Sequence, residues 1–403
     1  MIVEKIIATI FHFFIILLRT ISPHMIISTD TTHLILLGLL LAMFLIQAWY
    51  WLGYYRRAAF AKPESAGAKT SLPPLSVVIC ARNEAENLAR FLPDVLKQDY
   101  PSFEVVVVND CSEDNSYDVL GDLMKKFPNL KVSMIQKDPG FTHTKKLAML
   151  IGIKAAKNDL LVFTDADCRP ASPQWLRQVA AAAEGNNTDI VIGYGAYNEE
   201  KGLLNSYIRY ETMFVAMQYF GMAMAGKPYM GVGRNLAYRR TFFFAKGGFG
   251  PHNHIMSGDD DLFVNRNATS GNCSLMMTHD SFTLSVAAKT VREWAKQKKR
   301  HLTAAVYYKN QDKLRLFLEP FSRVTWYGLL ITMLIMLASW PVVAFLAVAR
   351  FAMRAVILRK AAAVFNERRL WFVSLFFDIF APFLTAFLYL TNRRKGKGRE
   401  TWK

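Results

Sequence analysis

The middle of the chain alternates between short apolar runs and longer amphipathic segments. Three of these segments have the apolar spacing of helices, over Glu84–Leu96, Ser116–Phe127 and Lys145–Lys157. The runs around them are short enough to be buried strands, at Leu75–Cys80, Phe103–Val108, Lys131–Ile135 and Leu160–Thr164. Continuous apolar strands separated by amphipathic helices predict an α/β fold whose mostly parallel central sheet is covered on both faces.

Longer apolar runs lie toward both ends of the chain. Leu34–Leu52 and Val324–Ala349 carry no charged residue, and Leu370–Asn392 holds only Asp378. Each run is long enough to cross a bilayer, so we predict transmembrane helices on either side of the α/β domain. The shorter run Ile6–Leu18 predicts an interfacial helix, with a signal peptide as the alternative, although no small-residue cleavage site stands out.

These patterns divide the chain into four parts. We expect a membrane anchor over residues 1–57 with its span at about 34–54, a linker over 58–74, a cytosolic domain over 75–322, and a membrane region with a basic tail over 323–403. Two single spans in the last region would place several basic residues outside, against the positive-inside tendency: Arg350, Arg354, Arg359, Lys360, Arg368 and Arg369. We favour a hairpin over 324–358, turning near Trp340–Pro341, which leaves 370–392 interfacial or re-entrant.

The formal net charge of the chain is +17. Clustered Lys and Arg suit either nucleic acid or an anionic membrane surface. Much of the charge flanks apolar runs, at Arg56, Arg57 and from Arg393 onward, which a nucleic-acid surface would not require. We therefore predict a multi-pass cell-membrane protein whose domain faces the cytoplasm, with no nucleic-acid partner. The four cysteines form no CxxC pair and are expected to be reduced thiols.

Polar clusters follow three of the four predicted strands, at Ala81–Glu84, Asn109–Asp114 and Asp165–Asp167. The carboxyl ends of parallel strands meet at one edge of a sheet, so these clusters predict a single ligand crevice. Helix capping by Asn, Asp and Ser would explain any one cluster, but explains three together less well.

Asp165 and Asp167 are the sharpest pair, because two carboxylates at a strand end can hold one hard cation. Mg²⁺ or Mn²⁺ prefers such oxygen ligands and shares them with substrate phosphates. Lys145 and Lys146 open a predicted helix, where a lysine either contacts phosphate or is simply solvated.

The second half is less regular and leaves several alternatives open. The glycines of Gly231–Tyr238 and Gly247–Gly248 allow close backbone approach to a ligand. The acids of Ser257–Leu262 repel one another, which raises at least one pKa and suits a general base, or they form an acidic helix N-terminus. Trp294–His301 fits a juxtamembrane anchor or a diphosphate clamp. Met213–Met230 fits a lipid-facing or acceptor-facing surface, or ordinary core.

The order of these motifs resembles the family-two inverting glycosyltransferases of the GT-A fold, over about residues 75–302, and the apolar runs resemble the integral-membrane branch of that family. The matching segments are Arg82–Glu84, Asn109–Asp114, Lys145 before Leu147–Ile153, Asp165–Asp167, Ser257–Leu262 and Gln297–His301. The last resembles the family's QxxRW motif, with histidine in place of tryptophan. That departure puts the polymer-synthase subgroup in doubt.

The resemblance implies a GT-A, Rossmann-like domain and a role for each motif. Its implied nucleotide-sugar-binding residues are Glu84, Asp110, Lys145, Asp165, Gln297 and Arg300. Asp165 and Asp167 would bind Mg²⁺ or Mn²⁺. The catalytic base would be Asp259 if the motif is anchored on Ser257 and Leu262, or Asp260 if it is anchored on Gly-Asp-Asp; we prefer Asp259.

We therefore predict an inverting glycosyltransferase that moves a sugar from a nucleotide-sugar, UDP-linked, to a lipid or lipid-linked acceptor, for glycolipid or cell-envelope polysaccharide biosynthesis. One alternative is a processive polysaccharide synthase. Another is an inactive membrane scaffold that binds nucleotide or lipid. A nucleotidyltransferase would show a glycine-rich loop after the first strand, where this chain has Ala81–Glu84.

Overall fold

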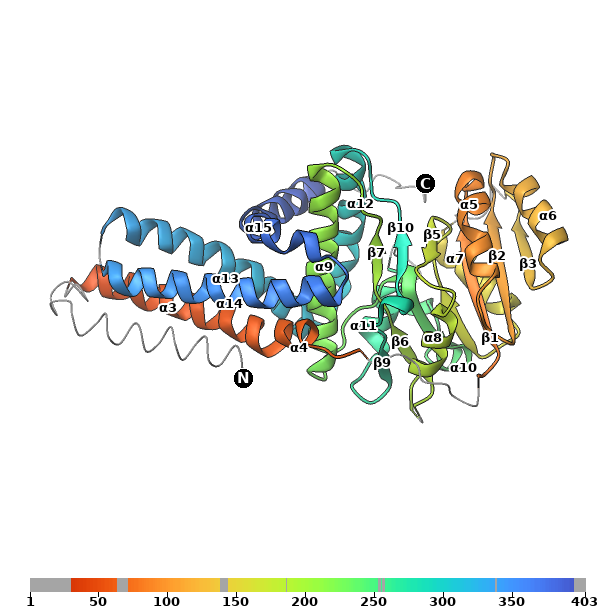
Figure 1. Cartoon of the computed structure of the whole chain (residues 1–403), viewed down its shortest axis with the longest axis horizontal. Helices are drawn as coiled ribbons and strands as arrows, with labels where there is room; N and C mark the ends of the chain where they lie inside the picture. Colours follow the sequence, from red (N-terminus) through yellow and green to blue (C-terminus); the bar gives the residue numbers. More distant parts are fainter. Residues whose placement is uncertain are drawn as a thin grey trace. The chain divides into compact units, whose positions relative to one another are not determined.

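The computed structural model describes residues 30–63, 72–137, 144–185, 187–252, 255, 258–337 and 339–394. They fall into two compact units, each described here by itself (Figure 1). The helical unit comprises the chain up to Ala61 together with Asn310–Phe387, and the α/β unit comprises Lys62–Lys309 together with the segment from Leu388. The expected interfacial helix at Ile6–Leu18, most of the linker and the basic tail lie outside the described residues.

A seven-stranded sheet with the order β3-β2-β1-β4-β8-β6-β9 forms the centre of the α/β unit. Its strands are β1 (Leu75–Ala81), β2 (Phe103–Asp110), β3 (Leu130–Ile135), β4 (Leu160–Phe163), β6 (Ile190–Ile192), β8 (Leu236–Arg239) and β9 (Cys273–Leu275). Strands β3, β2, β1 and β4 are parallel, and β8 runs antiparallel to its neighbours β4 and β6. The predicted α/β fold with a mostly parallel sheet is confirmed.

Helices cover both faces of this sheet, which is why β1 and β2 are mostly apolar and buried along their length. Helices α5 (Ala85–Leu96), α6 (Ser116–Lys126) and α8 (Trp175–Ala183) pack on the face that includes Val77 and Val105. Helix α7 (Lys145–Ala155) packs on the other face, so closely that a Cβ atom at Gly152 would lie 2.6 Å from Val78 Cγ1 and 3.0 Å from Val108 Cγ2. Only glycine allows this approach between helix and sheet.

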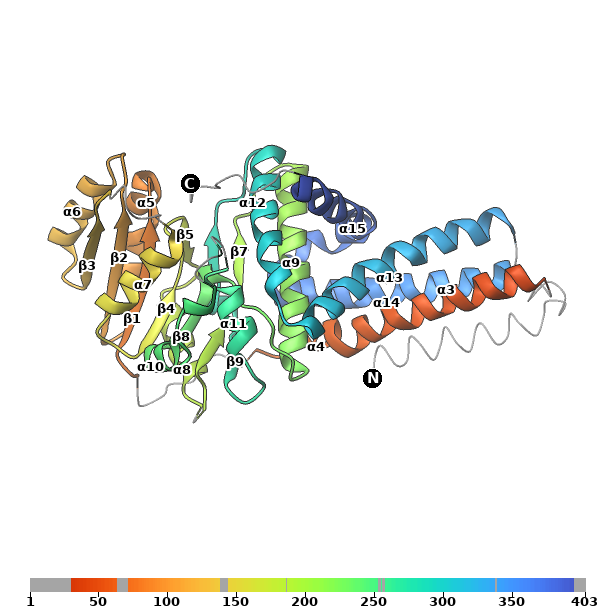
Figure 2. The ribbon, with the colours of Figure 1, turned by 180° about the vertical axis from the view of Figure 1, so that it is seen from behind.

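A second, three-stranded sheet has the order β5-β10-β7. Its strands are β5 (Cys168–Pro170), β7 (Gly195–Tyr197) and β10 (Thr283–Ser285), and the remaining helices of the unit are α9 (Leu203–Met224), α10 (Arg240–Ala245), α11 (Asp261–Asn267) and α12 (Val291–Ala304) (Figure 2). Strands of three residues are too short for an alternating pattern, so the sequence does not predict this sheet. In α9, Met213, Met217 and Phe220 are buried, which favours ordinary core for this segment over a lipid-facing surface.

The helical unit contains α3 (Thr31–Tyr50), a π-helical turn (Trp51–Tyr55), α4 (Arg56–Ala59), α13 (Asn310–Ile335), α14 (Trp340–Val364) and α15 (Trp371–Arg394). In the part of the chain that the structure describes, three segments are long and apolar enough to cross a membrane, at Thr31–Ala59, Trp340–Val364 and Arg368–Thr391. The uncharged run from Val324 is divided between two helices, α13 and α14. The hairpin and the number of spans in this region stay predictions.

Contacts within the helical unit define the direction of its helices. Leu40 packs in one cluster with Met333 and Val343, whereas Gln47 near the end of α3 donates to Ser322 Oγ of α13 (2.7 Å). Helix α13 therefore runs antiparallel to α3, and α14 returns parallel to it (Figures 1 and 2). At the far end of α14, the Lys360 ammonium lies 5.8 Å from the ring of Phe60, just beyond α4.

Charged side chains inside the helical unit are bound by acids or by polar and aromatic side chains. Arg323 forms ion pairs with Glu319 and with Asp378 (2.8 Å), and Arg354 pairs with the other oxygen of Asp378 (2.5 Å). Arg350 donates to Tyr327 Oη (3.1 Å) and lies over the Trp326 ring. A buried charge in apolar surroundings costs several kcal/mol unless it is paired.

This pairing bears on the expected conflict with the positive-inside tendency. Arg350 and Arg354 are both 2% exposed and so are not loop charges. Arg359 and Lys360 are exposed and lie at the same end of the unit as Arg56 and Arg57. A hairpin of α13 and α14 therefore brings both basic pairs to one side.

We expect cysteines introduced by Arg57→Cys and Arg359→Cys to be labelled from the same side of the membrane. Both positions are exposed at one end of the helical unit. The measurement uses an impermeant thiol reagent on intact cells and on inside-out vesicles, in a background without Cys80, Cys111, Cys168 and Cys273. Labelling of the two positions from opposite sides would contradict the hairpin.

Candidate active site

The loops after β1 and β2 are bonded to each other at the carboxyl edge of the sheet. The backbone N–H of Asn83 donates to Ser112 Oγ (2.9 Å), and its side-chain oxygen accepts from the N–H of Glu113 (2.7 Å). Asn83 has a φ of 54°, a left-handed conformation that asparagine tolerates better than most residues. These bonds bring the first two polar clusters together, with Glu84 and Asp110 both buried.

Lys145 connects the third cluster to the acidic motif of the second half. It is the first residue of α7, whose N-cap is Thr144. Its Nζ lies 2.8 Å from Asp165 Oδ1 and 3.3 Å from Asp259 Oδ2. Burial alone would raise the pKa of Asp165, but the charge and hydrogen bond of Lys145 outweigh burial and lower it. Lys145 is thus part of a carboxylate centre and not a solvated surface lysine.

Lys146 has a different role from its neighbour. It is 2% exposed, and its ammonium donates to the carbonyls of His252 and Ile255, both at 2.8 Å. Burial lowers its pKa. The expectation that this lysine is solvated or contacts phosphate is therefore wrong. Lys146 instead fixes the backbone of a segment that leads to Asp259.

Asp165, Asp167 and Cys168 offer three ligand atoms that lie within 4.8 Å of one another. Two carboxylates suit Mg²⁺ or Mn²⁺, which prefer oxygen. Burial, and then the neighbouring charge of Asp165, raises the pKa of Asp167, as expected for two acids that share one small space. Burial also raises the pKa of the Cys168 thiol, so this group stays protonated and is a poor ligand for a hard cation. The donor set therefore fits a metal held by the two aspartates.

The three consecutive acids have three different partners. Asp259 faces Lys145. Asp260 caps α11, and its two oxygens accept from the backbone N–H groups of Gly233 (2.6 Å) and Asp261 (2.8 Å). Asp261 accepts from Tyr308 Oη (2.6 Å).

Burial raises the pKa of Asp260 to about 6 and that of Asp261 to about 8. A pKa near 6 would suit a general base. The carboxylate of Asp260 is, however, already used by two backbone donors, so the geometry favours Asp259. Ser257, which begins the motif, lies outside the described residues.

The glycines of the segment Gly231–Tyr238 pack against other parts of the protein. A Cβ atom at Gly233 would lie 3.0 Å from Asp260 Oδ2, and one at Gly231 would lie 2.8 Å from Leu236 Cδ1. The expectation that these glycines admit a ligand is therefore replaced by a packing role. Gly247 and Gly248, with φ of 77° and 53°, form a turn after α10.

Helix α12 carries the motif that begins at Gln297. The Gln297 amide donates to Tyr197 Oη (3.3 Å), and the charge of Arg300 contributes to the lowered pKa of Asp165. Glu211 of α9 holds the helix from another side, because its two oxygens accept from Trp294 Nε1 (3.1 Å) and Lys298 Nζ (2.9 Å). The structure thus places Gln297 against Tyr197 and Arg300 where its charge acts on Asp165.

Several residues of this centre were not predicted from the sequence. They are Tyr197, Glu211, Arg234 and Tyr308. Arg234 stands inside the noted glycine segment, and its charge acts on both Asp165 and Asp167. Its position in the sequence, after two glycines and before an asparagine, was the local signal that could have indicated a functional residue. Tyr197 and Glu211 gave none, since their partners lie about a hundred residues away in sequence.

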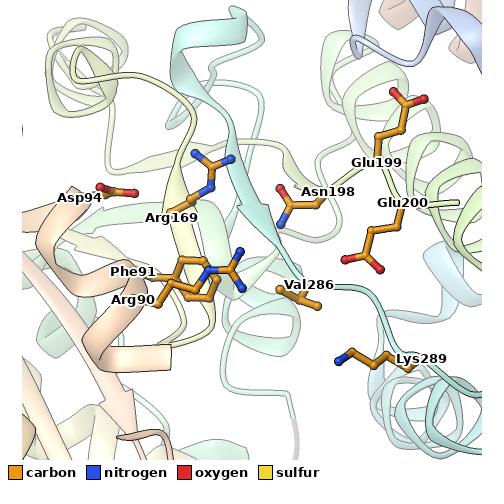
Figure 3. Close-up of a pocket in the computed structure, with 9 residues that line it drawn as sticks. All are labelled: Arg90, Phe91, Asp94, Arg169, Asn198, Glu199, Glu200, Val286 and Lys289. Carbon is orange, nitrogen blue, oxygen red and sulfur yellow. The ribbon is translucent and has the colours of Figure 1, made fainter. Parts of the chain in front are cut away.

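A cavity of about 590 Å³ lies beside the three-stranded sheet (Figure 3). Its lining residues are Arg90, Phe91, Asp94, Arg169, Asn198, Glu199, Glu200, Val286 and Lys289. Arg169 follows Asp167 by two residues, yet neither metal-site aspartate lines the cavity. Charged and amide side chains of this kind form hydrogen bonds with hydroxyl groups, and the volume is in the range of small-ligand sites, about 300–1,000 Å³.

Comparison with known proteins agrees with this fold. Residues 76–244 match the model of Glycosyl transferase family 2. The chain is 30% identical over 213 residues to glycosyltransferase AglE of Haloferax volcanii, covering 52% of this chain and 66% of that protein. It is 27% identical over 124 residues to beta-monoglucosyldiacylglycerol synthase of Trichormus variabilis, covering 30% of this chain and 26% of that protein.

A solved structure extends the agreement in fold. The mannosyltransferase PcManGT from Pyrobaculum calidifontis, in complex with GDP-Man and Mn²⁺, matches 86% of this chain and 99% of its own with a TM-score of 0.53 and 18% identity. The chain spans less than two thirds of the length of the two curated relatives. Residues 76–244 thus form a family-two glycosyltransferase domain, and the α/β unit has the GT-A fold.

We expect Glu211→Ala to lower the free energy of unfolding by about 1–3 kcal/mol, because it leaves two largely buried donors without their acceptor. Glu211 and Lys298 are only 15% and 18% exposed. Glu211→Gln keeps an acceptor for Trp294 and should cost less. The measurement is chemical unfolding, with the exposed Glu86→Ala of α5 as the control. Equal stability of Glu211→Ala and the control would show that the bonds of Glu211 to Trp294 and Lys298 do not stabilise the fold.

Proposed function

We propose that this protein transfers a sugar from a nucleotide-sugar to a lipid or lipid-linked acceptor at the cytoplasmic face of a membrane, with inversion at the anomeric carbon. The observation that carries the proposal is the position of Lys145 between Asp165 and Asp259. It brings together a carboxylate suited to a metal, a cation suited to phosphate and a second carboxylate suited to accept a proton.

The proposed reaction is a single displacement. Asp259 accepts the proton of the acceptor hydroxyl as its oxygen attacks the anomeric carbon. The bond from that carbon to the diphosphate breaks on the opposite face, and its electron pair stays on the diphosphate oxygen. Lys145 and Arg300 stabilise the added negative charge. No covalent intermediate with the protein is needed, so the configuration inverts.

Asp165 and Asp167 would hold Mg²⁺ or Mn²⁺, which supplies charge neutralisation for the diphosphate when bound. Glu84 and Asp110, buried at the ends of β1 and β2, would contact the nucleotide base. Gln297 would help to close the diphosphate side of the site through its bond to Tyr197.

The acceptor is proposed from two observations. Among the described residues, three segments are apolar enough to cross a membrane, which a fully soluble acceptor would not require. One relative, at 27% identity, is named for the synthesis of a glycolipid. A processive synthase would need a channel for its product, usually built from more helices. We therefore favour transfer of one or a few sugars, in glycolipid or cell-envelope biosynthesis.

The direct test incubates membranes that carry the chain with a panel of radiolabelled UDP-sugars and GDP-sugars and Mn²⁺. We expect label in the organic phase, released as short saccharides. Asp165→Ala or Asp167→Ala should lower transfer by about a hundredfold, the scale for losing a major electrostatic stabiliser. Glu86→Ala serves as the control. Label in long water-soluble polymer would favour the processive alternative. Full activity in EDTA would exclude the proposed requirement for a metal ion.

A second prediction separates chemistry from binding. Asp259→Asn should lower turnover by about a hundredfold or more, within the range for general-base catalysis, while nucleotide binding changes little. Asp260→Asn should instead lower stability, since Asp260 caps α11 and holds Gly233. Steady-state kinetics, nucleotide titration and thermal unfolding distinguish the two. If only Asp260→Asn loses turnover at unchanged stability, the base is Asp260.

A further inference from the structure

The side chain of Arg234 is bound by neutral groups. It lies in a short helical turn, Gly233–Asn235, directly before β8. Its Nη2 donates to the carbonyl of Gly195 (2.6 Å), and its guanidinium carbon lies 4.2 Å from the centre of the Tyr197 ring. The hydroxyl of Thr283 donates to its backbone carbonyl (2.9 Å). Neutral groups thus bind both its side chain and its backbone carbonyl.

The surrounding residues make room for this side chain. A Cβ atom at Gly195 would lie 2.3 Å from Arg234 Nε and 2.6 Å from its Cγ, so the side chain passes directly over bare backbone. The next residue, Asn235, is fully buried and bonds to the carbonyls of Tyr194 (2.8 Å) and Ser281 (2.7 Å). These bonds fix the position of the Arg234 guanidinium.

The neighbours of Arg234 place its charge beside the carboxylate centre. The preceding residue, Gly233, donates to Asp260 (2.6 Å), and Tyr197 accepts from Gln297 (3.3 Å). The charge of Arg234 also acts on Asp165 and Asp167. Among the described residues no carboxylate is within ion-pair distance of it. Lys145, in contrast, already has two carboxylate partners. A partly buried guanidinium without an anion is costly, which points to a ligand as its partner.

We propose that Arg234 binds the diphosphate of the nucleotide-sugar and stabilises it as the leaving group. This role rests on the proposed function and adds a third cation to the site. The planar guanidinium offers paired donors that match phosphate oxygens and stays charged at every working pH. As the bond to the anomeric carbon breaks, its electron pair adds charge to the diphosphate oxygen. A cation held ready by Tyr197 and Gly195 meets that charge without rearrangement.

The test measures binding of UDP, GDP and the matching monophosphates to the full chain in detergent with Mn²⁺. Arg234→Met should weaken diphosphate binding by roughly ten- to hundredfold, the scale of charge-assisted hydrogen bonds, and monophosphate binding far less. Arg234→Lys should be intermediate, because it keeps the charge and loses the planar fork. The matched control is Arg177→Met. Arg177 lies on α8 and is already paired with Asp99. Binding of Mn²⁺ alone should not weaken in any variant.

Each outcome bears on the proposal. Diphosphate affinities of Arg234→Met within twofold of the unchanged chain would overturn it. An equal loss of diphosphate and monophosphate binding, together with a lowered melting temperature, would assign Arg234 a structural role instead. If Arg234→Met does not fold, diphosphate binding by Arg234→Lys equal to that of the unchanged chain would also overturn it. Failure of the unchanged chain to bind either diphosphate would count against the proposed function itself.

Discussion

A single ammonium group joins the two halves of the α/β unit. Asp165 follows a strand of the parallel part of the sheet, and Asp259 comes from the irregular second half, yet both lie within 3.3 Å of Lys145 Nζ. Two carboxylates brought this close would repel each other and resist ionisation without a cation between them. The proposed metal site, the proposed base and the start of α7 all depend on this arrangement.

The parallel part of the fold could be predicted from the sequence because each element there is long enough to show its own pattern. Strands β1, β2 and β4 are buried on both faces and therefore mostly apolar, and the polar residues after them stand out. Strands β5, β7 and β10 have three residues each, so neither their sheet nor Tyr197 could be found. The sequence predicted that the base lies in the acidic motif, but left open whether it is Asp259 or Asp260. The bonds of Asp260 to two backbone N–H groups, which favour Asp259 as the base, appear only in the structure.

The helical unit illustrates how counting charges along a sequence can mislead. Arg350 and Arg354 look like loop residues by composition, but they are buried among aromatic rings, Gln47 and Asp378. Asp378, the one acid in its apolar run, is fully buried and binds two arginines from two other helices. A polar residue in such a run is then better explained by its partners than by its distance from the membrane surface.

The contact at Gly152 has a consequence for the tolerance of this enzyme to change. Gly152 lies seven residues after Lys145 on the same helix, about 10 Å along its axis. One added methyl group there would meet Val78 and Val108 and push the helix outward. The ammonium at the start of that helix would move with it, away from carboxylates that stay on other segments. Activity can thus be lost through a residue with no chemistry of its own, because a rigid helix carries a small displacement to the reacting groups.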